Sequence, residues 1–317
     1  MPELPEVECI RRSLERVIVG RNVRSVRIYR RDVIHGSALT HEPSPGSSEI
    51  FPTHQKKRVL DRIQTRMMLR GHTIHSINRH GKQLALIGCT QEEFPNPCVC
   101  IHLGMSGSLL HTIATQRRGK SRGPNDAFPK ANPSTNDHCH VIWRLDDDSS
   151  LVFRDPRRFG GIWLFRDSQE LWRQRWCKLG PDASLVKPRY LFKRLNITPR
   201  CVKAILLDQS VIAGLGNIYV DELLYVCRIH PLTPAHRIDF PTTTQLVRRM
   251  RRLLSRAIED GGSSFRDYIN GIGQRGRFQN KHCVYGRDNQ PCKKCQTPLS
   301  SLKITGRHSV YCPKCQV

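Results

Sequence analysis

The chain has 317 residues, which is room for about two domains with cores of their own and excludes a miniprotein. Lysine and arginine number 52 against 27 acidic residues, so the formal charge of +25 attracts polyanions without fixing the fold. The mean hydropathy is -0.48, and no apolar run approaches the ~18 residues of a membrane span. Such a basic composition is typical of nucleic-acid-binding proteins, and the alternative is a charged surface that serves only solubility.

The N-terminal half alternates between one helix and many short strands. Apolar residues recur at helical spacing from 7 to 17, before Gly20, and predict an amphipathic helix. Period-two alternation and short apolar runs predict strands at 22–29, 83–87, 99–103, 141–145, 151–154 and 162–165. Many short strands indicate a sandwich or a barrel. Residues 36–53 and 116–137 interrupt the rhythm and are predicted to be long surface loops.

The pattern changes to helices after residue 180. A linker is predicted near 181–188, and Thr198 followed by Pro199 predicts a capped helix start. A glycine-rich turn at 214–217 leads into a predicted helix at 218–227. A longer amphipathic helix is predicted at 242–260, where two glycines follow.

Four cysteines near the C-terminal end have the spacing of a metal site. Cys292, Cys295, Cys312 and Cys315 form two C-x2-C pairs separated by sixteen residues. Four thiolates in this arrangement provide the closed tetrahedral set of one structural zinc ion, which stabilises the fold and does no chemistry. Chance spacing is disfavoured, because the intervening residues resemble a hairpin around 306–307. Thirteen cysteines without a visible secretory signal favour reduced thiols or metal ligands in a reducing cytoplasm, and the other nine are predicted to be small buried residues.

Five motifs occur in a fixed order along the whole chain. They are Met1-Pro2-Glu3-Leu4-Pro5-Glu6, His102-Leu103-Gly104-Met105-Ser106-Gly107, Asp155-Pro156-Arg157-Arg158-Phe159-Gly160, Gly214-Leu215-Gly216-Asn217-Ile218-Tyr219 and the cysteine pairs. Together they closely resemble bacterial formamidopyrimidine-DNA glycosylases.

The resemblance implies an α+β fold in three parts. Residues 1–180 would form an N-terminal antiparallel β-sandwich with a leading helix and the catalytic site. Residues 189–280 would form a helical helix-two-turns-helix domain, and residues 281–317 a zinc finger. Damaged double-stranded DNA would lie in a basic cleft between the halves of a monomer that works in the bacterial cytoplasm and not at a membrane.

The activity implied is excision of oxidised purines, 8-oxoguanine and formamidopyrimidines, followed by β,δ-elimination at the abasic site. If Met1 is removed, as the family implies, Pro2 becomes an N-terminal secondary amine whose pKa lies near 8 before a positive field lowers it. Attack of this amine on the sugar C1′ gives an iminium that is cationic without a further proton. The cation acidifies C2′ and permits elimination of both phosphates.

Four charged residues match further functional positions of the family. Glu3 matches the general acid, with a helix-dipole partner as the alternative role, and Glu6 matches a second, positioning carboxylate. Lys82 matches a lysine that contacts a phosphate and donates a proton in elimination, although alone it would be an ordinary surface lysine. Arg307 matches the arginine that grips phosphates beside the lesion.

Six residues match DNA-contacting positions. Met105, Arg157 and Phe159 match the residues that fill the void left by a flipped base, with Arg157 facing the orphaned base. Core packing is the alternative for Met105 and Phe159, but a methionine between glycines in a turn is poorly placed for a core. The others are Asn217, expected to contact a phosphate at a helix start, Lys203 and His138.

Some features depart from the family. The predicted loops 36–53 and 116–137 are longer than usual, and we expect them to be inert insertions. Cys139, between His138 and His140, replaces an aspartate of many relatives; alternation along a strand disfavours a second metal there. The segment 271–278, which matches the loop over the everted base, is more basic than expected and leaves the lesion preference open.

Two other functions remain as alternatives. One is an endonuclease VIII-type glycosylase for oxidised pyrimidines, but that group usually has glycine where this chain has Leu4. The other is a non-catalytic binder of damaged DNA, against which the presence of Pro2, Glu3 and Lys82 argues.

Overall fold

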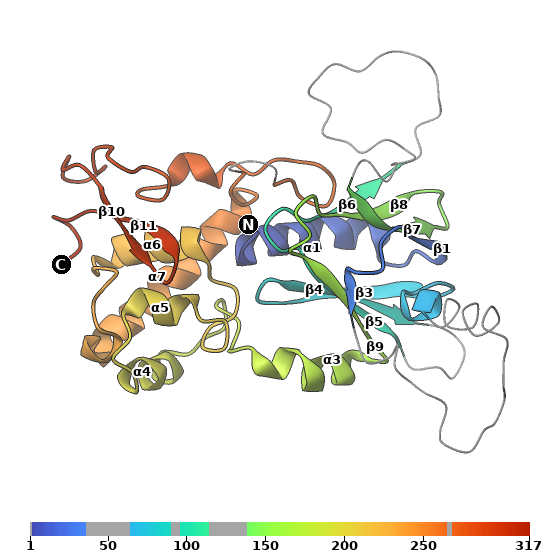
Figure 1. Ribbon diagram of the computed structural model, residues 1–317, viewed down its shortest axis with the longest axis horizontal. Helices are drawn as coiled ribbons and strands as arrows, with labels where there is room; N and C mark the ends of the chain where they lie inside the picture. Colours follow the sequence, from blue (N-terminus) through green and yellow to red (C-terminus); the bar gives the residue numbers. More distant parts are fainter. Residues whose placement is uncertain (1, 36–63, 90–95, 114–137, 265–267) are drawn as a thin grey trace, which may run out of the picture.

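The computed structural model describes residues 2–35, 64–89, 96–113, 138–264 and 268–317 (Figure 1). A part built mainly of strands holds the N-terminal half, and a part built mainly of helices holds the C-terminal half, as expected. The two predicted long loops, 36–53 and 116–137, lie outside the described residues. No described helix is long and apolar enough to cross a membrane.

The leading helix α1 spans Leu4–Ile18 and confirms the predicted amphipathic helix. Its N-cap is Glu3, whose side chain accepts from the backbone of the third helical residue, Glu6, while the Glu6 side chain accepts from the Glu3 backbone. This reciprocal capping box satisfies amide donors that the helix itself leaves free. The chain leaves the helix through Gly20, whose φ of 85° favours glycine.

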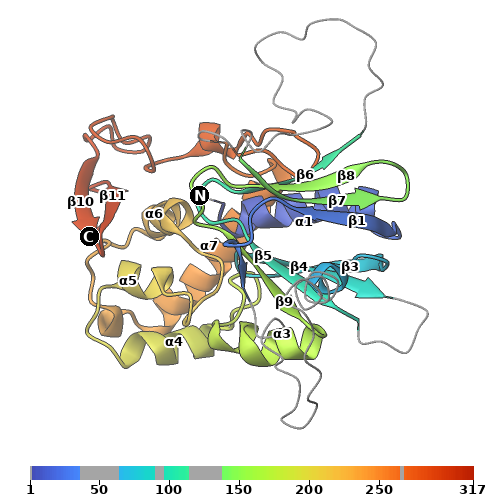
Figure 2. The ribbon, with the colours of Figure 1, turned by 45° about the vertical axis from the view of Figure 1, so that its right-hand side comes forward.

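Two sheets enclose α1 and the core of the N-terminal part (Figures 1 and 2). One sheet has the order β1-β7-β8-β6, with β1 Val23–Ile28, β7 Cys139–Leu145, β8 Ser150–Arg154 and β6 Ser108–Thr112. The other has the order β2-β9-β5-β4-β3, with β2 Ile34–His35, β9 Gly161–Phe165, β5 Cys98–His102, β4 Gln83–Cys89 and β3 Thr73–His80. Neighbouring strands are antiparallel except β2 and β9. Leu14 of α1 shares one buried cluster with Trp143 and Phe153 of one sheet and Leu84 and Ile101 of the other.

All six strands predicted from the sequence are present. The sequence pattern missed β2, β3 and β6, which are edge strands of their sheets. Ile74 and Ile77 are the buried apolar residues of β3, and its other side chains are polar. Edge strands are often polar, because an exposed apolar edge would promote aggregation. With few apolar residues, such a strand shows only a weak alternation of apolar and polar side chains in the sequence.

Among the described residues, five α-helices follow the second sheet: α3 Ser168–Gln174, α4 Pro188–Asn196, α5 Val202–Leu207, α6 Asn217–Cys227 and α7 Phe240–Glu259. The helices predicted at 218–227 and 242–260 correspond to α6 and α7. The predicted start at Thr198 is wrong, because α5 begins after Cys201. The backbone at Cys201 forms a bridge with Pro234, which holds the chain extended up to the helix. Pro188 is the first residue of α4 and not part of a linker.

The C-terminal hairpin consists of β10 Ser300–Ile304 and β11 Arg307–Tyr311. Thr305 and Gly306 at its turn have φ values of 46° and 75°, the left-handed geometry that a two-residue hairpin requires. The hairpin predicted around 306–307 is therefore present. The Gln316 amide donates to the Ile229 carbonyl oxygen at 2.9 Å, which ties the finger to the helical domain behind α6.

Candidate active site and metal centre

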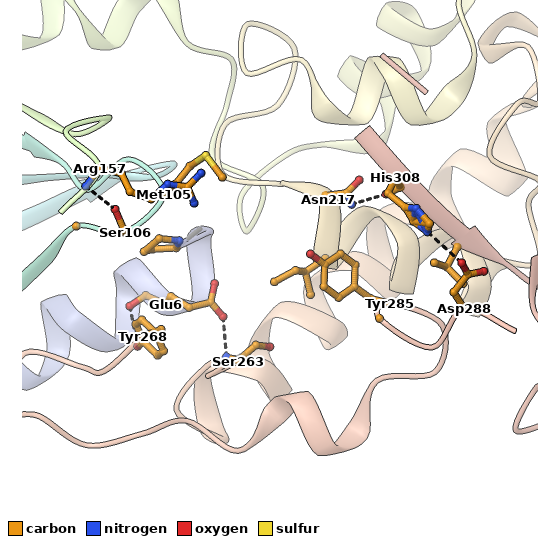
Figure 3. A pocket seen from close by; sticks show the side chains of 15 residues that line it. Glu6, Met105, Ser106, Arg157, Asn217, Ser263, Tyr268, Tyr285, Asp288 and His308 are labelled. Carbon is orange, nitrogen blue, oxygen red and sulfur yellow. Dashed lines mark hydrogen bonds and ion pairs between the residues drawn. The ribbon is translucent and has the colours of Figure 1, made fainter. Parts of the chain in front are cut away.

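The start of α1 lies beside a cavity of about 600 Å³ between the two halves of the molecule (Figure 3). Residues of both halves line it, among them Pro2, Glu6, Met105, Arg157, Asn217 and His308. The cavity therefore joins the N-terminal helix, two loops of the sandwich, the start of α6 and the C-terminal hairpin.

Glu3 is buried against the start of α6. Its carboxylate accepts from the backbone amides of Ile218 at 3.0 Å and Tyr219 at 3.4 Å. Free amides at a helix start carry a partial positive charge, so they stabilise the ionised carboxylate. A group held in this way is oriented before any ligand arrives.

Two glycines permit this close approach of α1 to α6. A Cβ on Gly216 would lie 2.4 Å from the Glu3 carboxyl carbon, and a Cβ on Gly214 would lie 2.6 Å from Leu4 Cδ1. Gly214 also has a φ of 112°, and its carbonyl oxygen accepts from the Leu4 amide at 3.0 Å. The glycines of the 214–219 motif are thus required by the contact with the N-terminal segment.

Glu6 is the most enclosed carboxylate of the site. Its Oε2 accepts from the Glu3 amide at 2.9 Å, and its Oε1 accepts from the Tyr219 hydroxyl at 2.5 Å and the Ser263 amide at 2.8 Å. Burial and the neighbouring Glu3 carboxylate raise the pKa of Glu6 to about 7, although these three donors oppose the rise. Glu6 therefore holds α1, α6 and the segment after α7 together.

Lys82 lies in the turn between β3 and β4 and is buried in the same region. Burial lowers the pKa of Lys82; the Glu3 carboxylate opposes this shift, and the Arg307 guanidinium adds to it. Lys82 is therefore close enough to both groups to respond to their charges. The turn itself is fixed by Asp182, which accepts from the Gly81 amide at 2.9 Å.

The structure thus brings together the four predicted catalytic residues, Pro2, Glu3, Lys82 and Arg307. They come from positions 2, 3, 82 and 307, so only the tertiary fold makes them neighbours.

Two loops of the sandwich present exposed side chains to the cleft. Met105 is 43% exposed and Phe159 is 58% exposed, which excludes core packing as their role. The Arg157 guanidinium carbon lies 5.3 Å from the centre of the Phe159 ring, within cation–π range. Asp155 locks the loops to each other, since its carboxylate accepts from the Ser106 hydroxyl at 2.7 Å and the Gly160 amide at 2.7 Å.

Asn217 is the first residue of α6 and borders the cleft. Its side-chain amide donates to the His308 carbonyl oxygen at 2.7 Å (Figure 3). This bond connects the helix start to the finger hairpin. A phosphate contact by Asn217 stays a prediction, and the neighbouring amides of the first helical turn are already used by Glu3.

Lys203 does not fit the expectation of a DNA-contacting residue. Its side chain is fully buried; its Nζ is paired with the Asp221 carboxylate and donates to the Ser309 hydroxyl at 2.5 Å. A lysine enclosed in this way does not reach a DNA phosphate, because its ammonium group contacts Asp221 and Ser309 instead of solvent. Lys203 instead joins α5 and α6 to the finger hairpin.

His138 lies away from the main cleft. It is exposed, has a φ of 55°, and borders a separate cavity of about 550 Å³ with Arg30 and Arg158. Neighbouring His140 is buried, and its Nε2 is bonded to the Asp155 carbonyl oxygen at 2.9 Å. Within the described residues, the His138–His140 segment belongs to no metal-binding cluster.

The four cysteines predicted to bind zinc converge. Their Sγ atoms lie within 4.8 Å of one another, with 4.0 Å from Cys292 to Cys315 and 3.4 Å from Cys295 to Cys312. A tetrahedral zinc with Zn–S bonds of ~2.3 Å needs sulfur atoms about 3.8 Å apart, so the set fits one structural ion. The backbone amide of Lys294 donates to Cys292 Sγ and that of Cys315 donates to Cys312 Sγ, both at 3.4 Å. Such hydrogen bonds stabilise thiolates.

Tyr219, Ser263 and Asp155 organise the site, but no sequence feature singles them out. Tyr219 ends the 214–219 motif and Asp155 begins the 155–160 motif, so both stood next to residues that were selected. Ser263 follows the two glycines that end α7, and only its contact with Glu6 reveals its role.

Three family models match consecutive parts of the chain. Residues 1–162 match the formamidopyrimidine-DNA glycosylase N-terminal domain, and residues 179–268 match the formamidopyrimidine-DNA glycosylase H2TH domain. Residues 289–317 match the zinc finger found in FPG and IleRS.

Relatives match over their full length. Formamidopyrimidine-DNA glycosylase of Bacillus subtilis is 35% identical over 319 residues, covering 100% of this chain and 99% of the relative. The Geobacillus kaustophilus protein of the same name is 34% identical over 318 residues, covering 100% of both chains.

Solved structures agree with these matches. A complex of Lactococcus lactis Fpg with DNA containing an abasic site has a TM-score of 0.76 and 29% identity, and the match covers 99% of each chain. A Lactococcus lactis FPG mutant bound to Fapy-dG-containing DNA has a TM-score of 0.76 and 28% identity at the same coverage. The chain belongs to the formamidopyrimidine-DNA glycosylase family.

Proposed function

We propose that the protein removes oxidised purines, including 8-oxoguanine and formamidopyrimidines, from duplex DNA and then cleaves the backbone at the abasic site. The observation that carries this proposal is the position of Pro2 in a cleft bordered by exposed Met105 and Arg157, next to the buried Glu3 and Lys82, whose charges interact. Relatives named formamidopyrimidine-DNA glycosylase and Fpg complexes with Fapy-dG and abasic-site DNA support it. Its place of action would be the cytoplasm of a bacterium.

Pro2 is the nucleophile of the proposed reaction. With Met1 removed, its nitrogen is a secondary amine that attacks C1′, and the base departs with the electron pair of the glycosidic bond. The Pro2 nitrogen loses its N–H proton to the Glu3 carboxylate, the C1′–O4′ bond opens as O4′ takes that proton, and the freed nitrogen lone pair forms the iminium. Loss of the C2′ proton expels the 3′ phosphate, and a second elimination expels the 5′ phosphate. The rigid proline ring keeps the nitrogen in place for the attack.

Glu3 and Lys82 handle protons in this scheme. Glu3 takes the proton released by the Pro2 nitrogen and passes it to O4′ as the general acid, since its carboxylate is held against the start of α6 one residue from the nucleophile. Lys82 contacts a phosphate and donates a proton during elimination; its lowered pKa makes that proton easier to give up. Glu6 acts as a positioning residue, because it orients the Glu3 amide and does not need to meet the substrate.

The exposed loop residues and the finger would hold the DNA. Met105, Arg157 and Phe159 are free to enter the gap that a flipped base leaves, with Arg157 toward the unpaired base. Arg307 sits at the exposed tip of the C-terminal hairpin, where it would grip phosphates beside the lesion. The cysteine set would hold a zinc ion that keeps this hairpin folded, and its closed donor set gives the ion no role in the reaction.

Borohydride trapping tests the proposal directly. Reduction of the iminium links protein and DNA permanently, so we expect trapping on a duplex with 8-oxoguanine and loss of trapping in Pro2→Gly. Mass spectrometry of the intact protein checks that Met1 is absent. No trapped complex with any lesion would reject the lyase mechanism, whereas trapping on an oxidised pyrimidine alone would favour the endonuclease VIII-type alternative.

A further inference from the structure

Helices α4 and α7 form a basic face outside the lesion cleft. Three cations come from α4 and five from α7: Arg189, Lys193, Arg194, Arg248, Arg249, Arg251, Arg252 and Arg256. We call these residues the α4–α7 face. The α4 sequence has no acidic residue, and the acidic residue of α7 is Glu259 at its last position. None of the eight cations lines the cavity at the active site.

The two helices present their cations side by side. Phe192 of α4 and Phe240 of α7 are in edge contact, with ring centres 5.5 Å apart. The Arg251 guanidinium donates to the Val186 carbonyl oxygen at 2.7 Å, just before α4 begins. Both ribbon views place α4 at the edge of the helical part, with α5 between it and the β10–β11 hairpin (Figures 1 and 2). Helix α4 therefore lies apart from the finger that borders the cleft.

The charge of this face is not neutralised within the protein. Among the residues that the structure describes, no ion pair includes any of the eight cations. The contrast is α1, where Arg11 and Arg12 both pair with Glu8. Like charges four residues apart on a helix repel one another, so the arrangement costs stability in the isolated protein.

The spacing of the α7 cations fits a duplex backbone. Arg248, Arg252 and Arg256 are exposed and follow one another by four residues, so they form a stripe about 12 Å long. Duplex DNA carries one negative charge per ~1.7 Å of axis, and guanidinium groups bind phosphates with paired hydrogen bonds. The stripe itself contains only arginines, and guanidinium groups without an aromatic stacking partner among them bind the backbone and not the bases.

We propose that the α4–α7 face is a second DNA-binding site, which holds a segment of undamaged duplex while the cleft holds another. The enzyme then passes directly from one segment to the other without being released into solution. Binding at this face is independent of sequence and damage, and the catalytic groups take no part in it.

Competitor-dependent dissociation tests the second site. The zinc-loaded full chain is bound to a fluorescent undamaged duplex, and its dissociation is followed in stopped flow as unlabelled duplex is added. Direct transfer requires the dissociation rate to rise with competitor concentration. We expect Arg248→Gln/Arg252→Gln/Arg256→Gln to reduce this slope at least fivefold, while single-turnover excision from a short lesion duplex stays within twofold.

A matched control removes the same charge elsewhere. Arg16→Gln/Arg173→Gln/Lys178→Gln neutralises three exposed cations of the N-terminal part, and its slope should equal that of the unmodified protein. A rate independent of competitor, or an equal slope in the α7 variant, would overturn the proposal. Faster dissociation at zero competitor with an unchanged slope would assign the face to the same duplex as the cleft. Binding to phosphatidylglycerol vesicles that the α7 variant alone loses, without any change in slope, would assign the face to a membrane surface.

Discussion

Replacement of Glu6 by glutamine should change how the stability of the protein depends on pH. The Glu6 carboxyl has an ordinary pKa of 4.5 in the unfolded chain and about 7 in the fold. Between these values the folded protein keeps a proton that the unfolded chain has lost. The free energy of unfolding therefore falls as pH rises through this window, because a folded-state pKa that is raised for an acid opposes folding once the group ionises.

The magnitude follows from the width of the window. One pKa unit corresponds to about 1.4 kcal/mol, so the Glu6 contribution between pH 5 and pH 7 is about 2–3 kcal/mol. Glu6→Gln lacks this contribution at every pH. Its amide nitrogen must, however, face one of the donors from Glu3, Tyr219 or Ser263, which costs about 1–3 kcal/mol at all pH values. We expect the variant to be less stable at pH 5 and to lose most of this deficit by pH 8.

Urea unfolding followed by far-ultraviolet circular dichroism, at intervals from pH 5 to pH 8, measures both curves. Subtracting the free energy of unfolding of the variant from that of the unmodified protein at each pH removes the contribution of every other titrating group. Glu15→Gln is the control, since Glu15 lies on the same helix, is exposed and pairs with Arg11, so its curve should run parallel to that of the unmodified protein. Parallel curves for Glu6→Gln as well would refute the argument and place the Glu6 pKa near its ordinary value.

Three further outcomes are expected. Gly216→Ala should reduce excision at least tenfold, because the added Cβ displaces Glu3. The control Gly88→Ala crowds Leu69 instead and should lower only the unfolding midpoint, so equal single-turnover activities of the two variants would contradict this. Lys203→Met should destabilise by about 3–5 kcal/mol, and adding Asp221→Leu should restore most of it; a double variant whose salt slope for DNA binding falls by about 0.9 would instead show a phosphate contact. Zinc chelation should abolish binding to a lesion duplex by unfolding the finger, while tryptophan fluorescence stays constant because all four tryptophans lie before residue 180. A fluorescence change that coincides with zinc loss would show that the finger stabilises the sandwich.

Elements with a strong local signal could be predicted from the amino-acid sequence alone. The helical spacing of residues 7–17 and the apolar runs of the central strands predict structure directly, because buried faces repeat with the period of the element. The cysteine spacing predicts a metal site, since two short turns suffice to place each pair of thiolates. The resemblance of five motifs also selected Pro2, Glu3 and Lys82 as candidate catalytic residues before any geometry was known.

Features that depend on long-range contacts became visible only in the folded chain. The edge strand β3 and the start of α5 are set by pairing partners distant in sequence, so their local patterns are weak or misleading. Lys203 looks like a surface cation in the sequence, and only the fold encloses it with Asp221. Tyr219 and Ser263 become part of the site because they meet Glu6 across more than two hundred residues, a proximity that no sequence period encodes. The net charge likewise does not show where the cations gather on the surface. The packing of α4 against α7 brings eight of them onto one face.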